Sequence, residues 1–267
     1  MKEETKDQTQ DLLEIFGIKL DSRFLIGSAG YPSPKILKES ILKSQASVVT
    51  MGVKRQVSQS GASVSSWYDE VKSTKKIILP NTAGCRTAKD AVNISEISRE
   101  IFQTNWIKLE IVGDEYTLQP DSFEIVEATR NLVARGFEVF VFCTEDILVA
   151  ERIVSEGCKV LMPWASPIGS GQGLLNLESL KRMRERFSDL ILIVDAGIGA
   201  PSHASKVMEI GFDAVLLNSA VSQAVDPVGM AQAFSLAINA GRKGFKSGLI
   251  APQPMAKAST QVGSEIF

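Results

Sequence analysis

Two charged residues lie inside an apolar stretch near the middle of the chain. Residues 106–112 read Trp-Ile-Lys-Leu-Glu-Ile-Val, the composition of a buried strand, and include Lys108 and Glu110. Because side chains alternate between the two faces of a strand, these two share one face, with their α-carbons about 7 Å apart. An ionisable pair on one face of an apolar strand predicts either an internal salt bridge or an active site.

A buried lysine is a candidate nucleophile toward a carbonyl, because burial lowers the pKa of the amine and frees its lone pair. Glu110 acts in the opposite direction and favours the ammonium form, unless its carboxyl is protonated or shuttles the proton. Asp195, which follows the apolar run 190–194, is a second candidate acid or base. The alternative is that Lys108, Glu110 and Asp195 form a charge network that only fills the core, although burying such ions is seldom net stabilising.

Eight short apolar runs predict the strands that position these residues. Near-continuous apolar runs are typical of parallel strands buried on both faces. The segments 124–136, 149–157 and 204–211 have apolar residues at helical spacing and end in glycine. We therefore predict an α/β fold, a single-domain (β/α)8 TIM barrel, with a doubly wound open sheet as the alternative. The predicted strands are residues 24–27, 47–51, 76–80, 106–112, 138–143, 159–162, 190–194 and 214–217.

Composition agrees with one globular domain. Of the 267 residues, 44% are hydrophobic and 22% are charged. We expect an N-terminal lead-in over residues 1–20, its first ten flexible or helical, a barrel over 21–248 and an irregular C-terminal arm over 249–267. The net charge of -2 gives no electrostatic reason to expect nucleic acid or an acidic membrane as partner, and no apolar run approaches the ~20 residues of a membrane span. The three cysteines show no metal-ligand spacing, and their number is odd, unlike that of a disulfide framework, so a reducing cytoplasm fits best.

Glycines cluster where the barrel would bind a ligand. Function in this fold gathers at the C-terminal ends of the strands, where the sequence places Gly169, Gly171, Gly173, Gly197 and Gly199. Their backbone N–H groups could approach a ligand closely, and the helix that begins near residue 201 would direct its positive end toward an anion. A phosphorylated small molecule is the predicted ligand; the alternative is that these glycines serve turn geometry alone.

Other reactive side chains are mostly predicted to be structural. His203 lies in the first turn of a helix without a metal-ligand pattern, which favours a surface or packing role. Cys143 and Cys158 have the positions of small core residues, whereas Cys85 lies in a loop and is left open. Residues 54–55, Lys-Arg, follow the second strand and either face the mouth of the site or are ordinary solvated charges.

Seven short motifs follow one another along the chain. They are Asn-Thr-Ala-Gly-Cys-Arg-Thr-Ala at 81–88, Ile-Lys-Leu-Glu at 107–110, Leu-Gln-Pro-Asp at 118–121, Met-Pro at 162–163, Ser-Pro-Ile-Gly-Ser-Gly-Gln-Gly at 166–173, Val-Asp-Ala-Gly-Ile-Gly at 194–199 and Leu-Asn-Ser-Ala at 217–220. In this order the motifs make the sequence similar to bacterial thiazole synthase of thiamin biosynthesis. The resemblance runs from about Phe24 to the C-terminus.

The resemblance implies a (β/α)8 enzyme that condenses 1-deoxy-D-xylulose 5-phosphate with dehydroglycine and sulfur. It implies that the sulfur arrives as the thiocarboxylate on the C-terminal glycine of a ubiquitin-like sulfur-carrier protein, and that a separate enzyme produces the dehydroglycine. It also implies a homotetramer without metal, nucleotide or other cofactor. By the same resemblance, Lys108 forms an imine with the sugar ketone, and Glu110 and Asp195 act as acid and base. Substrate and phosphate contacts fall on Gly169, Ala196, Gly197, Asn218 and Ser219.

Three positions depart from the family pattern. Gly30 stands where the family usually has a lysine, so a cation is missing near the mouth of the site. Trp164 replaces a smaller residue and could narrow or cap the pocket, while Ser219 replaces a threonine and keeps the hydroxyl.

Two other functions use the same features. A Schiff-base aldolase acting on a sugar phosphate would need the same lysine and phosphate loops, although no second barrel lysine lies near a strand C-terminus. A barrel that binds a metabolite or a ubiquitin-like protein without turnover would not need Lys108 for that binding.

Overall fold

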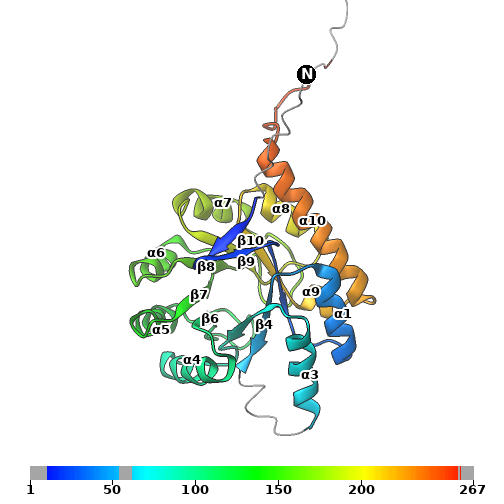
Figure 1. Ribbon diagram of the computed structural model, residues 1–267. Helices are drawn as coiled ribbons and strands as arrows, with labels where there is room; N and C mark the ends of the chain where they lie inside the picture. The colour runs from blue at the N-terminus through cyan, green and yellow to red at the C-terminus, as the bar shows by residue number, and fades with distance from the viewer. Residues whose placement is uncertain (1–10, 54–61, 258, 260–267) are drawn as a thin grey trace, which may run out of the picture.

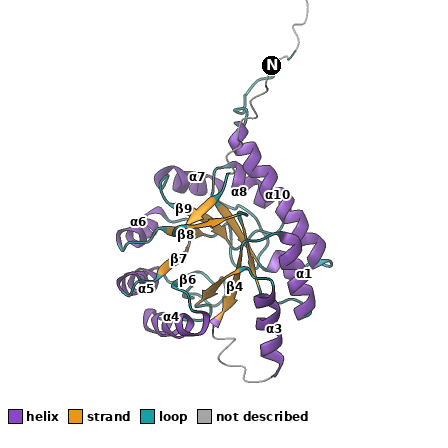
Figure 2. Ribbon diagram, in the orientation of Figure 1, coloured by secondary structure: helices purple, strands orange, loops and turns teal. Residues whose placement is uncertain are grey.

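The chain forms a closed barrel of eight parallel strands surrounded by helices (Figures 1 and 2). The structure, a computed structural model, describes residues 11–53, 62–257 and 259. The barrel closes because β10 pairs with β3 as well as with β9, which confirms the predicted (β/α)8 fold and excludes an open sheet. The barrel strands are β3 (Phe24–Gly27), β4 (Val48–Gly52), β5 (Ile77–Asn81), β6 (Trp106–Leu109), β7 (Glu138–Cys143), β8 (Val160–Pro163), β9 (Ile191–Asp195) and β10 (Ala214–Leu217).

Most helices begin at a side chain that caps their first turn. Asp121, for example, accepts hydrogen bonds from the N–H groups of Phe123 and Glu124. Gly136, Gly157 and Gly211, which follow three helices, have positive φ, as the predicted glycine C-termini require. The helices are α1 (Pro34–Ser44), α3 (Ala62–Ser73), α4 (Ala88–Phe102), α5 (Ser122–Ala134), α6 (Ile147–Ser155), α7 (Leu177–Arg186), α8 (Pro201–Glu209), α9 (Ser219–Ser222) and α10 (Pro227–Ser247).

The barrel interior is filled by apolar side chains and closed at its N-terminal end by a hairpin, β1 (Leu13–Ile15) and β2 (Ile18–Leu20). Phe16, at the turn of this hairpin, makes edge contacts with Phe140 and with Trp106, at ring-centroid distances of 5.6 and 6.3 Å. The hairpin falls within the expected N-terminal lead-in and was not predicted, because strands of three residues carry too little periodicity. The first ten residues, expected to be flexible or helical, lie outside the described residues.

One predicted strand is shorter than expected. The apolar run 106–112 continues to Val112, but β6 ends at Leu109, and only isolated bridges at Ile111 and Val112 follow it. Glu110 therefore lies just beyond the strand, where the ladder to β5 is interrupted.

The segment before the barrel is held by ion pairs, whereas the segment after it is irregular. Asp11 pairs with Arg23, which directly precedes β3, at 3.2 Å and with Arg242 of α10 at 2.7 Å. Residues 249–257, at the start of the predicted arm, contain neither helix nor strand. Within the described part of the chain, each helix is too short or too polar to cross a lipid bilayer.

Candidate active site

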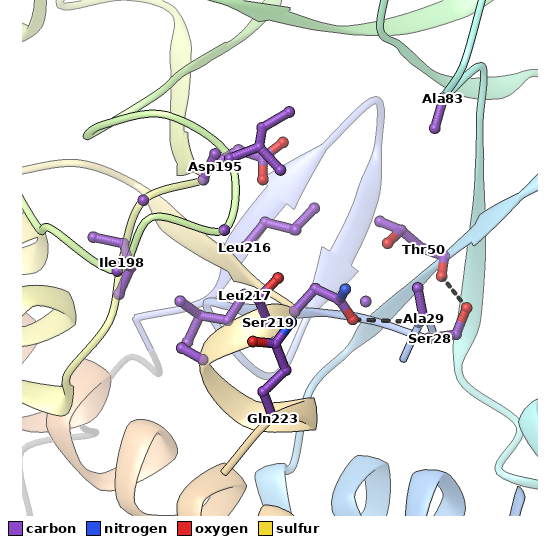
Figure 3. A pocket seen from close by; sticks show the side chains of 18 of the residues that line it. Ser28, Ala29, Thr50, Ala83, Asp195, Ile198, Leu216, Leu217, Ser219 and Gln223 are labelled. Carbon is purple, nitrogen blue, oxygen red and sulfur yellow. Dashed lines mark hydrogen bonds between the residues drawn. The ribbon is translucent and has the colours of Figure 1, made fainter. Parts of the chain in front are cut away.

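A cavity of about 670 Å³ opens at the C-terminal ends of the strands (Figure 3). Its walls come from the ends of β3, β4, β5, β6, β9 and β10 and from the loops that follow β8, β9 and β10. This is the end of the barrel that the sequence predicted to bear the chemistry.

Lys108, Glu110 and Asp195 meet in the wall of this cavity. The Lys108 Nζ lies 2.5 Å from Asp195 Oδ2 and 3.2 Å from Glu110 Oε2. All three residues are at most 9% exposed. The Lys108 ammonium also lies over the aromatic ring of Phe142 in β7, with Nζ 5.2 Å from the ring centroid, which is a cation–π contact. The end of β6 and the end of β9 are thus joined into one buried charge cluster. That these three residues lie together was predicted, whereas their roles stay predictions.

The two carboxylates decide the protonation of the lysine. Burial opposes the ammonium form, but the charges of Asp195 and Glu110 outweigh it, so the pKa of Lys108 is raised above its ordinary value. Burial does lower this pKa, as expected, but the opposing effect that was predicted for Glu110 is joined by that of Asp195, and together the two carboxylates outweigh burial. Burial in turn raises the pKa of Asp195, against the attraction of Lys108, and the charge of Glu110 adds to the rise. The raised pKa favours the ammonium form of Lys108, so a proton would have to pass to a carboxylate before this amine could act as a nucleophile.

The backbone after Asp195 has an unusual conformation. Ala196 has φ +74°, in the left-handed region that a residue with a β-carbon rarely adopts. Gly197 follows with φ +77°, and a β-carbon there would overlap Ser166 of the loop after β8. A β-carbon at Gly199 would overlap the backbone of Gly171 in the same loop. These two glycines are thus required for the close packing of the loops, whatever ligand the loops bind.

Asn218 and Ser219 form the adjacent part of the rim, after β10, which pairs with β9. The Asn218 Oδ1 accepts a hydrogen bond from the N–H of Ala29 at 3.3 Å, and a β-carbon at Gly27 would lie 2.6 Å from the Asn218 β-carbon. Figure 3 shows Ser219 beside Gln223 in the cavity wall. All five predicted substrate-contact residues line the cavity; they are Gly169, Ala196, Gly197, Asn218 and Ser219.

Other residues of the site have no role predicted from the sequence. Thr50 and Asn81 line the cavity near the C-terminal ends of β4 and β5, so the rule that these ends bear function could have found them. Gln223 lines the cavity after the four-residue helix α9, and Phe142 contacts Lys108 from within an apolar strand; no sequence signal marks either residue.

Residues predicted to be structural occupy structural positions. His203 Nδ1 accepts the N–H of Gly199 at 3.3 Å, and its ring fills the space beside Gly173, which is a packing role. Cys143 and Cys158 are buried core residues, and burial raises the pKa of both thiols, that of Cys158 to about 12. Cys85 is also fully buried.

The possible contributions of Trp164 and of residues 54–55 to the mouth of the site have different outcomes. Trp164 does not line the cavity; its indole N–H donates to Glu145, so the expectation that it narrows or caps the pocket was wrong. Residues 54–55 lie outside the described residues. Among the described residues, no group of three or more His, Cys, Asp or Glu side chains is arranged to hold a metal ion.

Comparison with known proteins identifies the family. The family model described as thiazole biosynthesis protein ThiG matches residues 14–261. A thiazole synthase of Coxiella burnetii (strain Dugway 5J108-111) is 52% identical, with 95% of this chain and 97% of that protein covered. A thiazole synthase of Gluconobacter oxydans is 53% identical over 92% and 96% of the two chains. A crystal structure of the Amycolatopsis orientalis BexX/CysO complex contains a chain that is 30% identical, with a TM-score of 0.81, over 92% and 98% of the two chains. With its barrel, its charge cluster and this similarity, the chain belongs to the thiazole synthase family of thiamin biosynthesis.

Proposed function

We propose that this chain condenses 1-deoxy-D-xylulose 5-phosphate with dehydroglycine and sulfur to form the thiazole phosphate moiety of thiamin. The observation that carries the proposal is the Lys108 ammonium, buried in the cavity wall between Asp195 and Glu110. A cavity of about 670 Å³ has room for a five-carbon sugar phosphate and a second small reactant.

Lys108 forms an imine with the ketone of the sugar. Asp195 is the nearer carboxylate and its pKa is raised, so it is the better acceptor for the ammonium proton. The neutral amine then adds to the carbonyl carbon, and loss of one water gives the imine. The imine draws electrons from the neighbouring C–H bond, so that a base can remove this proton while an acid returns one to the next oxygen or carbon. Glu110 and Asp195 come from different strands and can serve as this acid and base.

The phosphate is held at the rim by uncharged groups. Of the described residues that line the cavity, Lys108 is the only cationic one, and Gly30 provides no cation nearby. Backbone N–H groups around Gly169 and Gly197 and the hydroxyl of Ser219 are the available donors. A sugar that is bound as an imine at one end and by its phosphate at the other keeps one orientation through ring closure.

The sulfur donor is a ubiquitin-like carrier protein with a C-terminal glycine thiocarboxylate. Support comes from the similar chain of the BexX/CysO complex, which was solved with a second protein bound. We further propose a cytoplasmic homotetramer without cofactor, supplied with dehydroglycine by a separate enzyme. The lead-in over residues 1–20, the barrel over 21–248 and the arm over 249–267 remain the proposed organisation of the chain.

Borohydride trapping tests the imine. The protein is mixed with 1-deoxy-D-xylulose 5-phosphate and borohydride, and the adduct is located by intact-mass measurement and peptide mapping. We expect a single adduct on Lys108 and none in the Lys108→Arg variant. An adduct on another lysine would refute the assignment. No adduct, with sugar phosphate binding shown separately, would make the chain a binder without turnover.

A further inference from the structure

The ladder between β5 and β6 is interrupted immediately beside the charge cluster. Regular pairing ends where Asn81 is opposite Lys108, and it resumes where Cys85 is opposite Ile111. The β5 side thus has one more residue in the gap than the β6 side, which is the arrangement of a β-bulge. Bulges bend the strand and re-aim neighbouring side chains, so the position of Glu110 depends on how this gap is held.

The side chain of Thr82 holds the gap. In an uninterrupted parallel ladder, the N–H of Glu110 would donate to the carbonyl of Thr82. That carbonyl instead accepts the N–H of Cys85 at 3.0 Å, which closes a turn. The Thr82 hydroxyl takes its place: Oγ1 accepts the Glu110 N–H at 2.8 Å and donates to the Glu110 carbonyl at 2.8 Å. The N–H of Thr82 donates to the carbonyl of Lys108 at 3.1 Å.

Water cannot readily replace the hydrogen bonds that the Thr82 hydroxyl makes, because the site is buried. Thr82 is fully buried and Glu110 is 9% exposed, so water has little access to the two backbone groups that the hydroxyl satisfies. Thr82 is absent from the residues that line the cavity, and its side chain meets the reaction only through the backbone of Glu110. The carboxyl of Glu110, in turn, lies 3.2 Å from Lys108 Nζ.

We propose that Thr82 is a positioning residue whose hydroxyl fixes Glu110 for proton transfer at the Lys108 imine. The inference rests on the proposed function, since it takes Glu110 to be an acid or base. It makes a hydroxyl at position 82 necessary for turnover and not for imine formation, because Lys108 keeps its own strand pairing and its contact with Asp195.

The first test compares Thr82→Val, Thr82→Ser and wild type. Valine has nearly the shape of threonine without the hydroxyl, whereas serine keeps the hydroxyl. We expect Thr82→Val to lower kcat about 10²-fold, the scale of a 1 Å misplacement, with KM changed less than about 3-fold. Thr82→Ser should restore most of kcat, and only Thr82→Val should shift the limb of the pH–rate profile that Glu110→Gln abolishes. Equal kcat losses in Thr82→Ser and Thr82→Val would overturn the inference.

Thr129→Val is the matched control. Thr129 is buried in α5, and its hydroxyl donates to the carbonyl of Ile125 at 2.7 Å, away from the cavity. We expect it to lower the melting temperature and leave kcat and the pH profile unchanged. If Thr82→Val does not fold, Thr82→Cys replaces it, because a thiol is a weak donor and acceptor.

A double-mutant cycle with Glu110→Gln decides between positioning and a general structural effect. If Thr82 acts through Glu110, adding Thr82→Val to Glu110→Gln should cost little further activity, whereas independent effects would multiply and overturn the inference. Borohydride trapping separates this failure from that of the proposed function. Wild type and Thr82→Val should both give the Lys108 adduct. If wild type gives no adduct, the proposed function is refuted. If wild type gives the adduct and Glu110→Gln is impaired, but Thr82→Val is fully active, only the role of Thr82 is refuted.

Discussion

The two ends of the barrel bury different kinds of side chain, apolar at the N-terminal end and charged at the C-terminal end. At the N-terminal end, the β1–β2 hairpin buries Leu13, Ile15 and Leu20 against the apolar interior of the strands. At the C-terminal end, an ammonium and two carboxylates are buried together, beside an alanine at positive φ. Apolar burial stabilises the first end, whereas the second end bears desolvated charge and backbone strain, both of which cost stability.

This contrast indicates that the N-terminal end of the barrel serves mainly stability and the C-terminal end mainly the reaction. Removing apolar contact at the N-terminal end should lower stability without changing the reaction. Changing charge at the C-terminal end should stop the reaction while the fold persists. The following substitutions test that separation.

Lys108→Arg should have the largest effect. The guanidinium keeps the positive charge that Asp195 and Glu110 require, but it cannot form an imine at neutral pH. We expect turnover to fall at least about 10⁴-fold, as when a covalent nucleophile is removed, with the circular dichroism of a folded barrel retained. A folded variant with full turnover would remove the imine from the mechanism.

Asp195→Asn should bind the sugar phosphate but stall afterwards. Losing one acid or base typically costs about 10²- to 10⁴-fold in rate, which single-turnover kinetics would locate after binding. The substitution also removes one of the two charges that raise the pKa of Lys108, so this pKa should fall and adduct formation should extend to lower pH. Equal losses of binding and turnover would instead make Asp195 a residue that positions the substrate.

Ile15→Ala tests the opposite end. Ile15 is 1% exposed, and truncating such a side chain should lower the free energy of unfolding by about 2–5 kcal/mol, measured by urea denaturation. Ile18→Ala, in the same hairpin but 41% exposed, is the matched control and should change it by less than about 0.5 kcal/mol. Both variants should keep the kcat of wild type; a loss of kcat in folded Ile15→Ala would show that the two ends are coupled.

Sequence reasoning succeeded where one local pattern decides the outcome. The barrel strands were predicted to within a residue at most ends, because apolar runs such as 138–143 are buried on both faces. The proximity of Lys108, Glu110 and Asp195 could be predicted because charges within or directly after apolar strands are conspicuous, whereas their roles stay predictions. The packing of Gly197 on Ser166 involves two loops and has no such local pattern.

It failed where a distant contact overrides the local pattern. The run 106–112 has the composition of one strand, yet β6 ends at Leu109 because the Thr82 hydroxyl takes over the pairing of Glu110. The β1–β2 hairpin was missed because its apolar side chains are buried against the distant strands of the barrel interior, a contact that the local sequence does not reveal. The raised pKa of Lys108 depends on Asp195, which only the closed barrel brings within 2.5 Å.

Asp11→Asn should have the smallest effect and a defined pH dependence. The Asp11 carboxylate accepts a hydrogen bond from Arg242 and lies near Arg23 and Lys246, which lowers its pKa to about 2 despite partial burial. A lowered pKa means that the folded state prefers the charged carboxylate. The stabilisation is therefore complete above the unfolded value of 3.8 and is lost as the pH falls toward about 2.

Because this side chain is 35% exposed, solvent screens its ion pairs, and we expect Asp11→Asn to cost about 1 kcal/mol or less at pH 7. The stability difference between wild type and variant, measured by urea denaturation, should shrink between pH 4 and pH 2 and also in 1 M salt. A difference that persists at pH 2 would mean that Asp11 acts through its hydrogen-bond geometry. The hairpin would then be tied to α10 by shape rather than charge, and the N-terminal end would be insensitive to pH, unlike the C-terminal end.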